Sequence, residues 1–418
     1  MDDAPSAQLV ESKPVSSDDS PPPRAPRPAA PKASRRRTAI MIPVAVGLVA
    51  LVLGAIAAAS LMDPRRAQVT VPAIPQATRA VATQVTSVIP LGAFVQSIAI
   101  DETNGLAYVT RLADPAQVKP DDDETRRGTL SFVELASQRV VATVRVGIDP
   151  IGVAVDEPSG TVWVANSGDR SLTAVSVASR TAVGTVAVGE GPRHIAVDEA
   201  TGLVYVTNTD EDSVTVVDGR SRAIIDWMGV PARPHGVAFQ KNGGRLFVTN
   251  SEGGTTEVID PRAPQATFRV GERPFDVGVD EDLGSVYISN WGANTVTVVE
   301  AATHRWWDTI TVGECPFGVS VDLPARSVYV ANWASNSVSV IDANTRKVST
   351  TVNVGARPTS VAVDQRNGQV YVVNSGEGNV SVLGPAPQPA PDPATAAPDP
   401  AAQSATPGAA SPQPARTP

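Results

Sequence analysis

Residues 192–218 read PRHIAVDEATGLVYVTNTDEDSVTVVD, and this stretch decides the fold. It contains three short runs rich in Val, Thr, Ile and Tyr, the residue types that favour β-strands. The residues between the runs are Gly, Asp, Thr and other polar types that favour turns. The stretch therefore predicts three short strands, and a fourth run of the type Thr-x-x-Val closes the unit.

The same phrases recur along the chain. The first, of the type Pro-x-x-Val-Ala-Val-Asp, ends at positions spaced by 42, 42, 40, 42 and 42 residues: Asp156, Asp198, Gln240, Asp280, Asp322 and Asp364. Asp101 is the equivalent residue of an earlier unit. The second phrase has seven copies, at 106–110, 162–166, 204–208, 246–250, 286–290, 328–332 and 370–374. Four strands in every unit of this length predict an all-β fold, a seven-bladed β-propeller.

The sequence also predicts how the ring closes. The seventh unit ends after its third strand, at Val380 to Leu383, and continues into a Pro-rich tail. Residues 81–88 (VATQVTSV) resemble the fourth strand at 348–354. We therefore expect the N-terminal strand to complete the last blade, which would leave no open sheet edge in the ring.

These phrases, such as Val-Tyr-Val-Thr-Asn at 204–208, resemble the YVTN repeat of YncE-like β-propellers. The resemblance covers residues 81–384 and departs from the pattern at Arg111, where Asn is expected, and at Gln240, where Asp is expected. It implies the propeller fold but no shared set of catalytic residues. Function must therefore be argued from individual sites.

Composition excludes several classes of site. The chain of 418 residues has a single cysteine, Cys315, which excludes an intrachain disulfide and any Cys-rich metal site. No Cys-x-x-Cys-His motif is present for covalent haem, and no cofactor is predicted. The net charge is −9, and its acidic excess falls between the two tails. A net acidic body makes nucleic acid an unlikely partner.

The flanking segments predict the location. Residues 1–38 are rich in Pro, Ser and charge and are expected to be a disordered cytoplasmic segment. Residues 39–62 carry no charged side chain and are long enough to cross a membrane as one helix. Because Arg35 to Arg37 precede this segment, we expect a single-pass signal anchor with the propeller on the extracytoplasmic side of the cell membrane. A cleaved signal peptide, with a site near Ala59, is the alternative.

The remaining boundaries follow from composition. Residues 63–80 are predicted to be a linker, residues 81–384 the propeller, and residues 385–418 a disordered tail rich in Pro and Ala.

Blade one carries extra residues between Thr110 and Thr129, including the acidic run 121–124. That run lacks the spaced ligands of a calcium loop and is expected to be a solvated loop.

The candidate site lies on the face that carries the mouth of the central channel. There the residues after each repeat Pro should meet the loops between the second and third strands. This reasoning selects ten ligand-binding residues: Arg193, His194, Arg233, His235, Arg273, Phe275, Asp276, Trp291, Phe317 and Trp333. The aromatic residues of blades five and six are expected on one sector, with His and Arg on the adjoining sector. In the alternative interpretation the two Phe residues plug the channel and the Trp residues cover blade edges.

Two functional hypotheses follow. The first is a membrane-tethered binding or scaffold protein at the cell surface, whose channel-mouth face engages a small ligand, a surface glycan or a protein partner. The second is an enzyme of lyase or lactonase type that uses His194 and His235 with Asp276 nearby. Two His and a carboxylate could also bind a metal, but no metal site and no catalytic residue are predicted.

Overall fold

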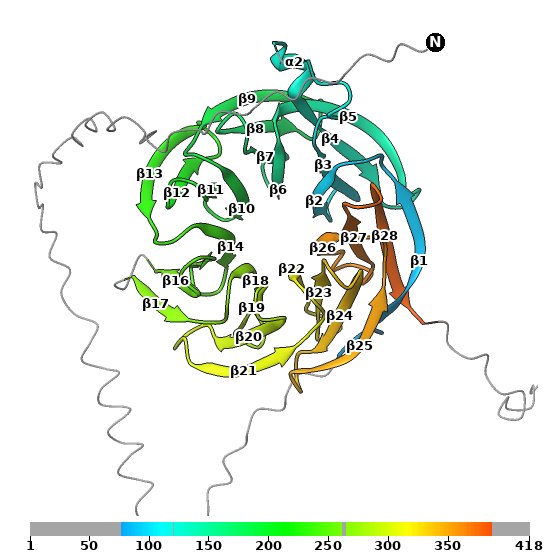
Figure 1. Ribbon diagram of the computed structural model, residues 1–418, viewed down its shortest axis with the longest axis vertical. Coiled ribbons are helices and arrows are strands. Elements are labelled where there is room, and N and C mark those ends of the chain that lie inside the picture. Colours follow the sequence, from blue (N-terminus) through cyan, green and yellow to red (C-terminus); the bar gives the residue numbers. More distant parts are fainter. Residues whose placement is uncertain (1–76, 120, 261–264, 387–418) are drawn as a thin grey trace, which may run out of the picture. The chain divides into compact units, whose positions relative to one another are not determined.

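The computed structural model describes residues 77–119, 121–260 and 265–386, and these form seven four-stranded antiparallel sheets around a common axis (Figure 1). The predicted seven-bladed β-propeller is confirmed. No helix within the described residues is long and apolar enough to span a membrane. The predicted membrane segment 39–62, the cytoplasmic segment 1–38 and nearly all of the tail 385–418 lie outside the described residues.

Each blade starts with an inner strand at the axis and continues outward. The inner strands are β2 (Val95–Asp101), β6 (Pro150–Asp156), β10 (Pro192–Asp198), β14 (Pro234–Gln240), β18 (Pro274–Asp280), β22 (Pro316–Asp322) and β26 (Pro358–Val363). The second strands are β3 (Leu106–Arg111), β7 (Thr161–Asn166), β11 (Leu203–Asn208), β15 (Arg245–Asn250), β19 (Ser285–Asn290), β23 (Ser327–Asn332) and β27 (Val370–Asn374).

The third and outer strands complete each blade, in the same order around the ring. The third strands are β4 (Arg127–Glu134), β8 (Ser171–Ser176), β12 (Ser213–Asp218), β16 (Thr255–Ile259), β20 (Thr295–Glu300), β24 (Ser337–Asp342) and β28 (Asn379–Pro385). The outer strands are β5 (Arg139–Ile148), β9 (Thr181–Ala187), β13 (Ala223–Gly229), β17 (Ala266–Arg269), β21 (Trp306–Thr311), β25 (Lys347–Asn353) and, from the N-terminus, β1 (Ala82–Pro90).

The hydrophobic core lies between the blades. Within the described residues, seven clusters of buried side chains each join one blade to the next, and neighbouring inner strands contact one another around the whole ring. The Val residues of the middle strands are buried on both faces of each sheet, because every sheet is covered on both sides by a neighbour. Fully burying such a side chain stabilises the fold by about 1.5–3 kcal/mol. The core therefore explains the Val-rich composition.

The Thr and Asn side chains of the second phrase hold neighbouring strands in place, both within a blade and between blades. Asn208 donates from Nδ2 to the Ser213 and Thr215 hydroxyls, which ties the second strand of blade three to the third strand. Thr207 donates from Oγ1 to the backbone oxygen of His235, in the next blade, at 2.7 Å. The phrase that identifies the repeat thus also fixes the start of the neighbouring inner strand, where the candidate site lies.

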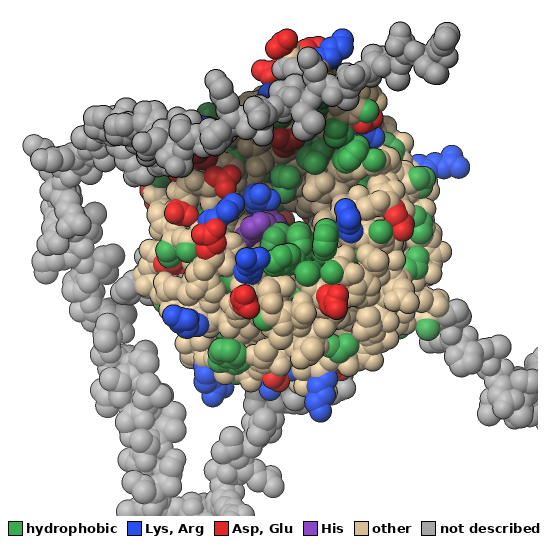
Figure 2. Space-filling model, viewed as in Figure 1, with side chains coloured by type: hydrophobic (Ala, Val, Ile, Leu, Met, Phe, Trp, Pro, Cys, Tyr) green, Lys and Arg blue, Asp and Glu red, His purple; other side chains and the backbone are tan. Residues whose placement is uncertain are grey.

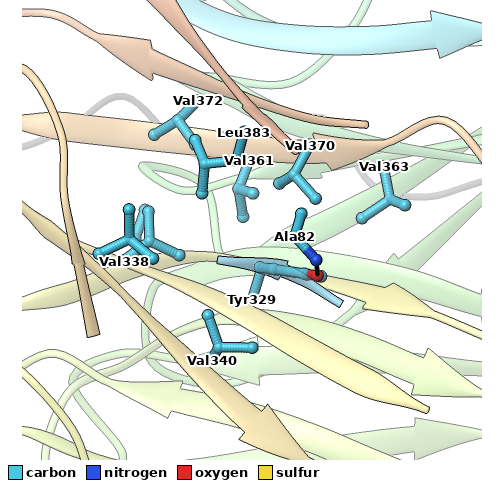
Figure 3. Close-up of a cluster of buried hydrophobic side chains, with 11 residues drawn as sticks. Ala82, Tyr329, Val338, Val340, Val361, Val363, Val370, Val372 and Leu383 are labelled. Carbon is cyan, nitrogen blue, oxygen red and sulfur yellow. Dashed lines mark hydrogen bonds between the residues drawn. The ribbon is translucent and has the colours of Figure 1, made fainter. Parts of the chain in front are cut away.

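The predicted closure is confirmed, since β1 pairs with β28 in the sheet order β1-β28-β27-β26. The backbone N–H of Ala82 donates to the hydroxyl of Tyr329 in blade six at 3.0 Å (Figure 3). Residues before β1 also contact the ring, because the backbone N–H of Thr78 donates to the backbone oxygen of Pro324 at 2.8 Å. Thr78 lies inside the segment 63–80 that we expected to be only a linker.

The insertion in blade one contains a short helix, α2 (Asp123–Arg126), where a loop was expected. The Asp122 side chain caps it by accepting a hydrogen bond from the backbone N–H of Glu124 at 3.1 Å. Glu124 also forms ion pairs with Arg127 at 3.0 Å and Arg145 at 3.4 Å. The acidic run is therefore partly neutralised by neighbouring arginines.

Candidate functional site

One face of the propeller carries the starts of the inner strands and the loops between second and third strands, and we refer to it as the channel-mouth face. The repeat places the residue after each Pro at the same height on neighbouring blades. On blades four to six these residues are His235, Phe275 and Phe317, whose ring centroids follow one another at 3.8 and 4.0 Å. Figure 2 shows the histidines at the centre of this face beside a group of hydrophobic side chains.

A pocket of about 380 Å³ opens on the channel-mouth face over blades three to six, and we call it the mouth pocket. Seven of the ten predicted residues line it: Arg193, Arg233, His235, Arg273, Phe275, Trp291 and Phe317. The structure thus brings together most of the residues that the repeat alignment selected. Three further lining residues, Thr209, Ser251 and Glu252, were missed.

Two of the three missed residues share a repeat position with a predicted one. Thr209 and Ser251 directly follow the Asn of the second phrase, as Trp291 does in blade five. In blades two to seven the residue at this position donates its backbone N–H to the backbone oxygen of the residue before the repeat Pro. Ser251 bonds Arg233 at 3.0 Å and Trp291 bonds Arg273 at 2.9 Å. This repeat position would therefore have identified Thr209 and Ser251, although only its Trp residues were predicted to bind a ligand.

The other three predicted residues lie beside the mouth pocket. Trp333 stacks against Phe317 with centroids 6.3 Å apart, and the guanidinium of Arg357 lies over its ring. His194 and Asp276 lie one residue further along their inner strands, with Nδ1 and Oδ1 3.5 Å apart.

The histidines of blades three and four and the phenylalanines of blades five and six form one continuous row. His194 contacts His235 at 5.5 Å between ring centroids, His235 contacts Phe275, and Phe275 contacts Phe317. Asp276 joins the first part of its inner strand to the next blade, because its Oδ2 accepts a hydrogen bond from the backbone N–H of Val319 at 2.9 Å. The histidines thus form part of the aromatic wall.

The three arginines of the mouth pocket differ in their partners. Arg233 pairs with Asp210 at 3.1 Å and with Glu252 at 3.3 Å. Arg273 lies over the ring of Trp291, 5.3 Å from its centroid. Arg193 forms no ion pair with any described residue, and its Nε atom is buried without a hydrogen-bond partner among them.

Burial controls the ionisation of the inner wall. It lowers the pKa of His235 well below the usual range, and the electrostatic influence of the neighbouring His194, Arg193 and Arg233 lowers it further. Burial also lowers the pKa of Arg193, with Asp210 acting in the opposite direction. His235 is therefore neutral at pH 7, so its imidazole can accept one hydrogen bond and donate another.

Among the described residues, no group of three or more His, Cys, Asp or Glu side chains is arranged to hold a metal ion. The third histidine, His304, lies between β20 and β21 and stacks on Phe268 at 5.8 Å, away from the residues of the mouth pocket. It therefore takes no part in the row of His194 and His235.

Comparison with known proteins agrees with this architecture. A family model described as YNCE-like beta-propeller matches residues 124–368, which is more than half of the chain. Among solved structures, the chain is similar to a chain of Kuenenia stuttgartiensis hydrazine synthase, with a TM-score of 0.59 and 16% identity over 71% of this chain and 96% of that chain. Identity this low shows the fold alone. No curated protein matches the sequence.

Proposed function

The chain belongs to the YncE-like β-propeller family, and on that premise we propose that it binds a small ligand in the mouth pocket, on the outside of a cell membrane. The observation that supports this most is the asymmetry of the channel-mouth face. Arginines, a neutral histidine and aromatic rings are gathered over four neighbouring blades around a cavity of about 380 Å³. Small-molecule sites commonly have volumes of about 300–1,000 Å³ and this mixture of apolar walls with a few polar groups.

Two arginines of the pocket rim occupy a special backbone position of the repeat. The residue before the repeat Pro has a positive φ, which is 64° at Gly191 but also 57° at Arg233 and 50° at Arg273. A side chain at such a position costs about 1–2 kcal/mol, whereas glycine adopts it freely. Asp149, Cys315 and Arg357 adopt the same conformation in other blades, so it belongs to the repeat, and Arg233 and Arg273 are set apart by lining the mouth pocket.

The ends of the propeller leave the mouth pocket accessible. Ala82, the first residue of β1, pairs with Pro385, the last residue of β28, and both lie at the ends of their strands that are remote from the channel-mouth face. At the other end of the same pair, Leu91 bonds Gly378. The described chain ends of the ring therefore lie on the side opposite the pocket.

A test of binding uses two matched variants. Arg273→Gly removes a pocket arginine and relieves the positive φ, so the fold should be retained; Arg357→Gly makes the same change at the equivalent position of blade seven, outside the pocket. The purified full-length chain is incubated with a low-mass extract of its source cells, and released compounds are identified by mass spectrometry. We expect a compound enriched by the wild type and by Arg357→Gly but not by Arg273→Gly. Equal enrichment by all three proteins would contradict the proposal.

The same experiment addresses the enzymatic alternative, which rests on the contact between His194 and Asp276. If the compound is converted during incubation, and His194→Asn stops the conversion without reducing binding, the protein is an enzyme of lyase or lactonase type. Retention of an oligosaccharide or a peptide in place of a small molecule would identify a glycan or a protein as the partner.

The membrane tether is tested separately. We expect intact cells to expose the propeller, but not the N-terminal segment, to added protease, and the mature protein to keep its N-terminus. A mature N-terminus near Ala59 or Ser60 would show a cleaved signal peptide in place of the anchor.

A further inference from the structure

We infer that the ligand of the mouth pocket is a small planar aromatic carboxylate, whose ring lies against Phe275 and Phe317 and whose carboxylate lies at Arg193. This inference rests on the proposed binding function and specifies the chemistry of the same site. Charge, unpaired polar atoms and ring geometry each support it.

The charge balance of the pocket favours an anion. The chain carries a net charge of −9, yet three arginines and only one carboxylate, that of Glu252, line this cavity. Glu252 and the neighbouring Asp210 both form ion pairs with Arg233. Arg193 and Arg273 are left without a carboxylate partner among the described residues, so the pocket keeps a positive charge that a ligand can match.

Arg193 offers a position in the pocket where an anion would stabilise the protein. A charged group removed from water is costly unless it is paired, because the interior solvates it poorly. Arg193 is largely desolvated, forms no ion pair with a described residue, and lines the pocket. A planar guanidinium binds a carboxylate through two parallel hydrogen bonds, which makes this the matching ligand group.

Two further polar atoms of the wall lack partners. Nδ1 of His235 and Nε1 of Trp291 are buried and form no hydrogen bond with a described residue. His235 is only 8% exposed and lines the mouth pocket. Buried polar atoms are nearly always hydrogen-bonded in native proteins, so these two nitrogens are hydrogen-bonding groups that the described residues leave unused.

The opposite part of the pocket fits an aromatic ring. Phe275 and Phe317 are tilted by 39° at 4.0 Å, and His235 is tilted by 37° against Phe275 at 3.8 Å. The row thus presents aromatic surface to the cavity, on which a planar ring can pack in an offset or edge-to-face arrangement. A neutral sugar could also stack there, but it would leave Arg193 unpaired. This difference favours the aromatic carboxylate over a glycan.

The experiment is a calorimetric titration of the purified full-length chain with 2-naphthoate, 2-naphthalenemethanol, cyclohexanecarboxylate and maltotriose. We expect 2-naphthoate to bind at least tenfold more tightly than its neutral alcohol and its non-aromatic analogue. Arg193→Met should weaken naphthoate at least tenfold without changing the affinity for the alcohol, and Phe317→Leu should weaken both ligands. Arg357→Met, a change of the same type outside the pocket, should alter neither affinity by more than twofold.

Each outcome decides the inference. Equal affinity for naphthoate and its alcohol, or naphthoate binding that survives Arg193→Met, overturns it. Binding of maltotriose that depends on Phe317 but not on Arg193 also overturns it, although the pocket would then still be a binding site. If no probe binds, the aromatic carboxylate is rejected, and the incubation with cell extract described above decides separately whether the pocket binds any ligand. All variants must melt as the wild type does for their affinities to be compared.

Discussion

Nη2 of Arg79 lies 2.6 Å from Oδ1 of Asp322, so a residue of the segment before the first strand is joined by an ion pair to the last residue of the inner strand of blade six. Asp322 is fully buried. Arg79 also donates from Nη1 to the backbone oxygen of Gln365 in blade seven at 2.6 Å. One side chain therefore connects the N-terminal segment to blades six and seven.

We predict that Arg79→Met lowers the free energy of unfolding by about 3 kcal/mol, because it leaves the buried carboxylate of Asp322 without its cation. The control is Arg170→Met, which removes an ion pair with Glu190 whose two side chains are 61% and 50% exposed. Exposed pairs contribute about 0–1 kcal/mol. Urea unfolding followed by circular dichroism measures both. Equal losses in the two variants would contradict a closing role for Arg79.

Deleting residues 79–90 should lower the melting temperature by about 10 °C or more, since it removes the outer strand of blade seven and several kcal/mol of burial. Buried Ala82 and Ile89 would be lost, together with the hydrogen bond to Tyr329. Differential scanning calorimetry measures the change. A synthetic peptide of residues 77–92 added in excess should restore part of the loss, and an unchanged melting temperature without peptide would show that β1 does not close the ring.

Gly236→Ala should destabilise the protein by about 1–3 kcal/mol, the usual cost of overpacking a well-packed site. A Cβ at this position would come within 2.7 Å of the Asp276 Cα and of the Phe275 backbone oxygen. The matched control is Gly229→Ala, where a Cβ would meet nothing within 4 Å. Thermal melts compare the two variants. Because the clash displaces Phe275, Gly236→Ala should also weaken ligand binding, and an unaffected affinity would mean that the pocket wall tolerates the shift.

Acid should destabilise the protein through His235. Its folded-state pKa lies well below the unfolded value of about 6.5, so only the unfolded state takes up a proton as the pH falls below that value. The contribution of this residue to stability is therefore complete above about pH 6.5 and decreases at lower pH. His235→Phe should reduce the loss of stability between pH 7.5 and 5. His304, whose pKa is also lowered by burial, should account for part of the remaining loss. An identical pH profile in wild type and His235→Phe would disprove the assignment to His235.

Much of the architecture could be predicted because every blade repeats the same local pattern. The second phrase is buried on both faces of its sheet, so its Val, Tyr and Asn recur in each unit and define the number and order of the strands. The missing fourth strand of the last unit likewise required a partner, and the similar run at 81–88 was the candidate. The contacts of Thr78 and Arg79 had no counterpart in the repeat and could not be found in this way.

The sequence by itself determined the strand order, the seven blades and the positions that face the channel mouth, since all three depend on local periodicity and hydrophobic pattern. Only the tertiary structure decided which residues at those positions share a cavity. Arg193 and Phe317 are far apart in the chain and meet because the ring places blades three to six side by side. The unequal pairing of the three arginines also arises there, because it depends on which carboxylates the neighbouring loops bring within reach.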